Sequence, residues 1–261
     1  RIFDLRSVIY FSIIKFMKPD SIYFFVVIAV TFLISGCSPK YYVPPQPNIP
    51  ALANGGEGKF GTSFSLPQFG VGGMAFDAQM SYSPIKHLGL TADGMYFSGG
   101  NKTNDYSGKG IVGNVGLGYY GMAGERWGAD VYAGIGKGSI RMNQDSLKFF
   151  SSELMRYYIQ PGVFYRTRRF DFGLVFRLSR LLYEDMKYYS QADNDDMLYG
   201  EKFLFYEPSL YLALGGNLVK AKFQITPSFK IDNELEFNRQ KLVLSFGIDF
   251  LIGRNRADKL K

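Results

Sequence analysis

The residues of this chain that could act together chemically are charged side chains that recur inside otherwise apolar segments. They occupy alternate positions, so charges from different segments would face one shared interior. The residues predicted to line that interior are Glu57, Lys59, Asp77, Asp93, Asp130, Arg156, Arg166, Asp171, Arg177, Glu207, Lys220, Lys222 and Asp249. Their signs are nearly balanced, and buried charges are tolerated only when they are paired. We therefore expect a salt-bridge network across the interior that includes Tyr120, Tyr132, Tyr158 and Tyr211.

The single histidine, His87, is the side chain best suited to general acid–base chemistry at neutral pH. It follows Pro84 closely in a predicted short turn, which favours a structural role. The glycine-rich stretch 134–139 lacks the spacing of a phosphate-binding loop, so its glycines are predicted to make room for neighbouring tyrosines. No spacing points to a site made of carboxylates alone. We expect a protein that is not an enzyme and uses no metal or cofactor.

Apolar and polar residues alternate over about ten residues in many segments from residue 57 onward, which is the period of a β-strand with two different faces. Between Phe170 and Leu178 the even positions are apolar, whereas Asp171 and Arg177 occupy odd ones. Ten strands are predicted, near Glu57–Leu66, Met74–Ser83, Leu88–Ser98, Ile111–Tyr120, Trp127–Ile140, Leu154–Thr167, Phe170–Tyr183, Phe203–Leu214, Leu218–Phe229 and Lys241–Ile252.

The same alternation occurs in soluble β-sandwiches and lipocalins, which turn their apolar faces inward. Aromatic residues make up 17% of the chain, and the predicted strands are about as long as the ~9–11 residues that cross a bilayer at a tilt. An even strand number is also typical of bacterial outer-membrane barrels. We therefore predict an all-β, transmembrane antiparallel up-and-down β-barrel over residues 57–252, with its apolar faces toward lipid.

An apolar run from Ile22 to Gly36 ends directly before the one cysteine, Cys37. The run is shorter than the ~20 residues of a membrane-spanning helix and follows Met17 and Lys18, a plausible basic start. The end of this run resembles the lipobox of bacterial lipoproteins. The resemblance implies a signal peptide over residues 1–36, with its true start at Met17, and a lipid on the thiol of Cys37. An uncleaved anchor helix and a structural thiol are the alternatives.

Five prolines follow the cysteine and favour an extended chain, so residues 37–56 are predicted to form a lipidated tether. Lipoproteins of the Bacteroidetes type that reach the cell surface commonly carry acidic residues soon after the cysteine. Residues 38–42 contain none. This departure favours a lipid in the periplasmic leaflet of the outer membrane.

The predicted connections after the even-numbered strands are short, and most of those after the odd-numbered strands are longer and more polar. Outer-membrane barrels have short periplasmic turns and long extracellular loops. The asymmetry therefore predicts that both chain ends lie in the periplasm.

The last predicted strand resembles the β-signal that the barrel-assembly machinery reads, through Ser245, Gly247, Phe250 and Ile252. A basic tail, residues 253–261, follows it, whereas many bacterial barrels stop at an aromatic residue. Taken together, the lipobox, the tether and the ten-strand pattern resemble small, uncharacterised outer-membrane β-barrel lipoproteins of Bacteroidetes. No named activity comes with this resemblance.

The net charge of +7 is spread along the chain without a basic patch interleaved with aromatic residues, so we expect no nucleic-acid partner. The main hypothesis is an accessory subunit or surface-binding protein with a protein partner in the outer membrane. Its recognition element would be the tyrosine-rich loop Glu184–Lys202. A narrow pore and, third, a barrel enzyme acting on lipid or peptide are the alternatives.

Overall fold

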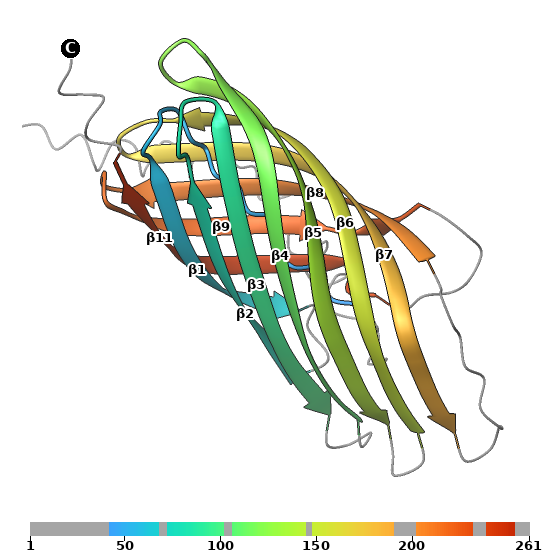
Figure 1. Ribbon diagram of the computed structural model, residues 1–261. Coiled ribbons are helices and arrows are strands. Elements are labelled where there is room, and N and C mark those ends of the chain that lie inside the picture. The colour runs from blue at the N-terminus through green and yellow to red at the C-terminus, as the bar shows by residue number, and fades with distance from the viewer. Residues whose placement is uncertain are drawn as a thin grey trace, which may run out of the picture.

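The computed structural model of the protein describes residues 42–67, 72–101, 106–144, 148–190, 202–231 and 239–253. These residues form one all-β domain (Figure 1). Its strands are β1 (Gly58–Pro67), β2 (Gly72–Tyr82), β3 (Leu88–Asn101), β4 (Tyr106–Ala123), β5 (Trp127–Gln144), β6 (Lys148–Arg166), β7 (Phe170–Ser190), β8 (Lys202–Gly215), β9 (Val219–Pro227), β10 (Phe229–Lys230) and β11 (Leu242–Ile252).

The strands β1 to β8 each pair antiparallel with the next in the chain, β9 pairs with β11, β10 pairs with β8, and the first strand pairs with the last. The pairing of β1 with β11 places Gly58 opposite Ile252 and closes the sheet into a barrel. β9 and β10 form one continuous barrel strand that is interrupted at Ser228, because both pair with β8. We call each of the ten barrel strands, with β9 and β10 counted as one, a stave. The predicted fold, an up-and-down barrel of ten staves, is confirmed. Within the described residues, no helix is long and apolar enough to cross a membrane.

The two faces of the barrel differ in polarity as the alternation predicts. Large apolar side chains, among them Phe64, Tyr119 and Trp127, are exposed on the outer face, while Asp249, Arg156 and other charged residues are buried inside. A soluble barrel would place these groups the other way round. The outer apolar band is therefore the surface that contacts lipid.

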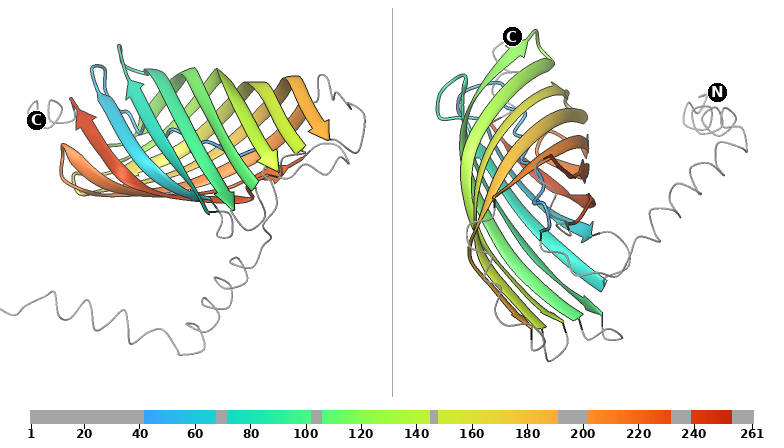
Figure 2. Two further views of the ribbon diagram at one scale, coloured as in Figure 1. Left: turned by 90° about the horizontal axis from the view of Figure 1, so that it is seen from below. Right: turned by 90° about the vertical axis from the view of Figure 1, so that its right-hand side faces the viewer.

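The barrel has two unequal walls. Strands β4 to β7 have 18 to 21 residues, whereas β1, β2, β9 and β11 have 9 to 11, so one wall projects beyond the other (Figures 1 and 2). We name the end with the projecting wall the long-strand end and the other the short-turn end.

The strands predicted from sequence are too short at the long-strand end. β4 begins at Tyr106 rather than Ile111, and β7 runs to Ser190, so residues 184–190 of the predicted recognition loop are strand. Beyond the apolar band the two faces exchange polarity: Arg141 is exposed outside, while Met142 and Phe150 are buried inside. A pattern of outward-facing apolar residues therefore predicts a strand only as far as the apolar band, although the strand itself continues.

Of the glycines in the stretch 134–139, Gly134 makes room for a tyrosine as predicted, whereas Gly136 lies against Asn114 and Gly138 against Val112. A methyl group on Gly134 would lie 2.5 Å from the Tyr158 ring of β6. Gly134→Ala is expected to lower the free energy of unfolding by about 1–3 kcal/mol, because Tyr158 and the β4 backbone must shift. Urea unfolding of the detergent-solubilised protein measures this. Gly121→Ala in β4, where a methyl group meets nothing within 4 Å, is the matched control and should not destabilise. Equal losses for both variants would contradict the packing explanation.

Candidate functional site

The lumen of the barrel is occupied by the protein's own N-terminal segment. Residues 42–53 run through the interior and are almost entirely buried, with Tyr42 and Ile49 each 1% exposed (Figure 2). We name residues 42–53 the plug. The sequence predicted that this stretch is an extended tether, and it has no helix or regular strand, but it lies inside the barrel rather than between membrane and domain.

The backbone carbonyls of the plug are hydrogen-bonded by long polar side chains of the barrel wall. Prolines at 44, 45, 47 and 50 have no N–H, so the segment cannot satisfy its own carbonyls. Wall side chains donate from β7, β2, β9, β6 and β1. The pairs are Arg177 to Pro45, Gln79 to Gln46 (3.1 Å), Gln224 to Pro47 (2.9 Å), Gln160 to Asn48 (2.7 Å), Lys59 to Ile49 and Arg166 to Ala51 (2.9 Å).

Side chains of the plug add a second set of contacts. The Tyr42 hydroxyl donates to Glu207 at 2.6 Å, and the Asn48 amide donates to the Met80 carbonyl at 2.8 Å. Ile49 packs in a small apolar cluster with Val175. Since the contacts come from staves all around the barrel, the plug fixes the interior as a single packed unit.

The plug enters the lumen from the long-strand end. The Tyr42 carbonyl accepts from the backbone N–H of Gln240, which precedes β11 at that end. The Ala53 N–H donates to the Glu57 carboxylate at 3.0 Å at the short-turn end, where β1 begins. Burial raises the pKa of Glu57, but hydrogen bonds and charge from Arg166, with Asn54 and Ala53 as further donors, outweigh it and leave that pKa lowered. Glu57 is therefore an ionised carboxylate that binds the end of the plug nearest the short turns.

One group of buried charges lies beside the Tyr42 end of the plug. Glu207 of β8 accepts from Arg156 at 2.5 Å and from Arg177 at 2.9 Å. Ser179 adds a hydrogen bond to the same carboxylate at 3.0 Å, and Tyr42 binds its other oxygen. The two arginines thus share one carboxylate, and all three charged side chains are at most 2% exposed.

The remaining ion pairs lie nearer the short-turn end. Lys220 pairs with Asp171 at 2.7 Å, and Asp249 lies 3.2 Å from Lys222 and 3.7 Å from Lys59. These pairs follow the wall, between staves that are adjacent or separated by one.

The Arg166–Glu57 pair, at 2.6 Å, links β6 to the residue before β1 on the opposite side of the barrel. The expected network is thus present mainly as groups along the wall, and the plug fills the centre.

Three of the predicted lumen carboxylates lack an ion pair within the described residues. Asp77 accepts from Ser65 at 2.6 Å, and Asp93 accepts from the Asn114 amide at 2.5 Å. Neither oxygen of Asp130 has a hydrogen-bond partner in the part of the chain that the structure describes.

Three of the four tyrosines expected in the network form side-chain hydrogen bonds, and only Tyr211 bonds to a charged group. The Tyr211 hydroxyl binds Asp249 at 2.6 Å, and that of Tyr120 lies 2.7 Å from Ser83. Tyr158 bonds to Thr91, and the Tyr132 hydroxyl has no hydrogen-bond partner among the described residues.

Sequence reasoning missed the three glutamines that hold the plug, Gln79, Gln160 and Gln224. All occupy inward positions and are at most 3% exposed. A signal was present: a proline-rich segment has free carbonyls, and long amide donors on an otherwise charged lumen face match them. Without a reason to place the segment inside the barrel, the sequence gives no partner for these glutamine side chains.

His87 lies in the turn between β2 and β3 at the short-turn end, as predicted. Its Nδ1 lies 2.9 Å from the Tyr120 carbonyl oxygen, and its ring stacks on Tyr119. These contacts are structural in kind. Among the described residues, no group of three or more histidine, cysteine, aspartate or glutamate side chains could hold a metal ion.

The predicted assembly-signal residues all lie on β11, the strand that closes the barrel. Ser245 points inward and is fully buried, whereas Phe250 and Ile252 are exposed on the lipid-facing side. Gly247 allows close approach of β1, because a methyl group there would collide with the Thr62 carbonyl. Several predicted features lie outside the described residues: the predicted signal peptide, Cys37, loop residues 191–201 and tail residues 254–261.

Comparison with known proteins places the chain near no characterised family. No family model and no curated protein matches it. Among solved structures, it is similar to the translocator domain of the autotransporter NalP from Neisseria meningitidis, with 11% identity and a TM-score of 0.44. That match covers 76% of this chain and 89% of the other.

Proposed function

We propose that the protein is a non-enzymatic outer-membrane barrel that is sealed by its own N-terminal segment and serves as a membrane-embedded accessory subunit or surface-binding protein. The plug is the observation that carries this proposal. A ten-stave barrel is only somewhat wider than eight-stranded barrels, which side chains alone can fill. One extended chain with its carbonyls bound to the wall takes up the additional space.

The projecting wall of β4 to β7 supports a binding role outside the membrane. Its outer face carries Lys137 and Glu153, which form an exposed ion pair at 2.8 Å, and farther along β5 it carries Arg141 and Asn143. Lipid-facing strands carry few charges, so the far end of this wall supports contact with a partner outside the hydrocarbon.

A gated pore is the second candidate, because the plug carries no charged side chain. Residues 42–53 contain no Asp, Glu, Lys or Arg, so only hydrogen bonds and packing hold the plug in the lumen. Such a segment can leave without separating an ion pair. A partner that pulls on the N-terminal side of the plug would then open the barrel.

The direction of the plug also bears on the side of the membrane that carries the lipid. If short turns face the periplasm, as in outer-membrane barrels, the Tyr42 end of the plug lies toward the extracellular side. Tyr42 is five positions after Cys37, a reach of at most about 18 Å. We therefore propose surface anchoring of Cys37, in place of the periplasmic leaflet that its flanking residues favour.

An epitope inserted after Lys40 tests this arrangement. The matched control is the same epitope in the β4–β5 turn at residues 124–126, which lies at the short-turn end. We expect antibody to bind the first variant on intact cells and the second only after the outer membrane is permeabilised. Detection of both epitopes on the same side would contradict threading of the plug through the barrel.

A further inference from the structure

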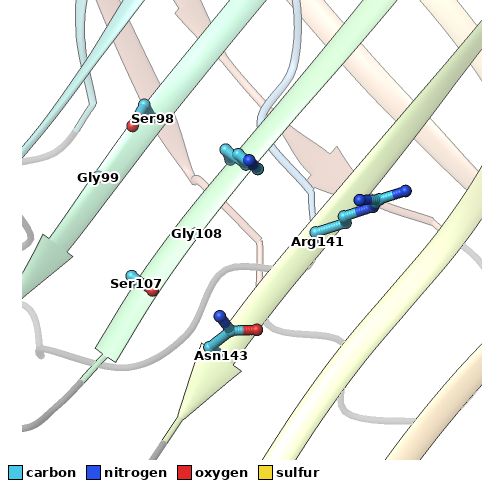
Figure 3. Close-up of a pocket in the computed structure, with 7 residues that line it drawn as sticks. Ser98, Gly99, Ser107, Gly108, Arg141 and Asn143 are labelled. Atoms are coloured by element: carbon cyan, nitrogen blue, oxygen red, sulfur yellow. The ribbon is translucent and has the colours of Figure 1, made fainter.

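A small polar pocket lies on the outer face of β3, β4 and β5, on the projecting part of the wall. Its volume is about 350 Å³, and its lining side chains are Ser98, Ser107, Lys109, Arg141 and Asn143 (Figure 3). Ser98, Lys109 and Arg141 are direct neighbours across the three strands, and Ser107 pairs with Asn143 in the next row. All five side chains belong to the exposed face.

The pocket brings two cations together without an acid between them. Lys109 and Arg141 are paired across β4 and β5, and like charges directly opposite each other are destabilising. In the described part of the chain, neither forms an ion pair. Lys137, on the same face, does have a partner, Glu153. A pocket with two unneutralised cations, two hydroxyls and an amide favours an anion with several oxygens, and the Arg fork fits two oxygens of a phosphate.

The position of the pocket identifies the source of that phosphate. The next outward row toward the short-turn end contains Tyr96 and Ile111, which are 49% and 57% exposed. The pocket thus begins about 7 Å along the strand beyond the apolar band. Headgroup phosphates lie at this depth, directly outside the hydrocarbon, and cations near an anionic membrane surface attract them.

We infer that Lys109 and Arg141, with Ser98, Ser107 and Asn143, form a binding site for the phosphate of an anionic lipid in the leaflet at the long-strand end. The site lies on the outside of the barrel and does not depend on whether the lumen is sealed. It fixes the depth and rotation of the projecting wall at the membrane surface.

The test measures binding of fluorescent phosphatidic acid to the full-length protein in zwitterionic detergent micelles. Lys109→Gln or Arg141→Gln is expected to weaken binding about fivefold, and the double variant about thirtyfold. Lys137→Gln removes a cation from the same face and is the matched control, with a change of less than twofold. Fluorescent phosphatidylcholine should bind no better to the unmodified protein than to the double variant.

Three results would overturn the inference. Equal weakening by Lys137→Gln and the double variant would mean that surface charge, not the pocket, attracts the lipid. Competition by millimolar inorganic phosphate, with no preference for the lipid, would make the site one for free phosphate. Unchanged lipid binding in the double variant would remove the pocket altogether. Heat-modified mobility on gels verifies that each variant is folded.

Discussion

Deletion of residues 42–53 is expected to convert a silent barrel into a channel. The full-length protein should show no steady conductance in a planar bilayer, whereas the deletion variant should open in discrete steps. Deletion leaves every strand pairing intact, including β1 with β11. The wall groups that held the plug, such as Gln160 and Gln224, would then bind water. With the signs of the lumen charges nearly balanced, the open pore should be only weakly ion-selective.

A graded variant separates the plug from the barrel itself. Replacing Gln46 and Asn48 together by glycine removes their side-chain bonds to Thr226, Met80 and other wall groups but keeps the chain in place. We expect brief openings from this variant and sustained ones from the deletion. A deletion variant that is folded by gel mobility and still silent would show that the charge groups alone seal the lumen. That result would sink the plug as the seal.

The strands of this protein were accessible from sequence because each outward apolar residue reports a lipid contact. Phe170 to Leu178 is a complete example: it alternates strictly and lies wholly within the membrane band. The same rule failed at the far ends of the long strands, where Arg141 is exposed outside while Met142 and Phe150 are buried inside. There the apolar residues occupy the inward positions and the polar residues the outward ones. A pattern typical of membrane strands cannot detect such a strand.

The extended conformation of the plug could be predicted from sequence, but its location inside the barrel could not. Proline determines local conformation, and the extended shape of residues 42–53 follows from it. Local conformation does not determine surroundings, since an extended chain suits a solvated tether and a lined lumen equally. The deciding partners lie far along the chain: Gln160 and Gln224 are 112 and 177 residues from the carbonyls they bind. Only the closed barrel brings them together.

The largest loss of stability is expected from Glu207→Leu. Glu207 is the shared partner of Arg156 and Arg177, and it also accepts from Tyr42 of the plug. Its removal takes the hydrogen-bonded counter-charge away from two fully buried guanidinium groups and leaves them only the more distant charge of Asp93, which costs about 3–5 kcal/mol. The urea midpoint of the detergent-solubilised protein should fall accordingly. Glu153→Gln, which breaks the exposed pair with Lys137, is the matched control and should leave the midpoint unchanged.

A compensating variant tests whether the loss comes from uncompensated charge or from packing. Replacing Arg156 and Arg177 by methionine together with Glu207→Leu removes all three charges, and apolar replacement of a buried ionic triad is often neutral or stabilising. We expect this triple variant to regain most of the lost stability. It should nevertheless flicker in a planar bilayer, because the plug has lost the Arg177 bond to Pro45 and the Glu207 bond to Tyr42. A triple variant as unstable as Glu207→Leu would assign the loss to packing, and a stable, silent one would show that the triad does not hold the plug.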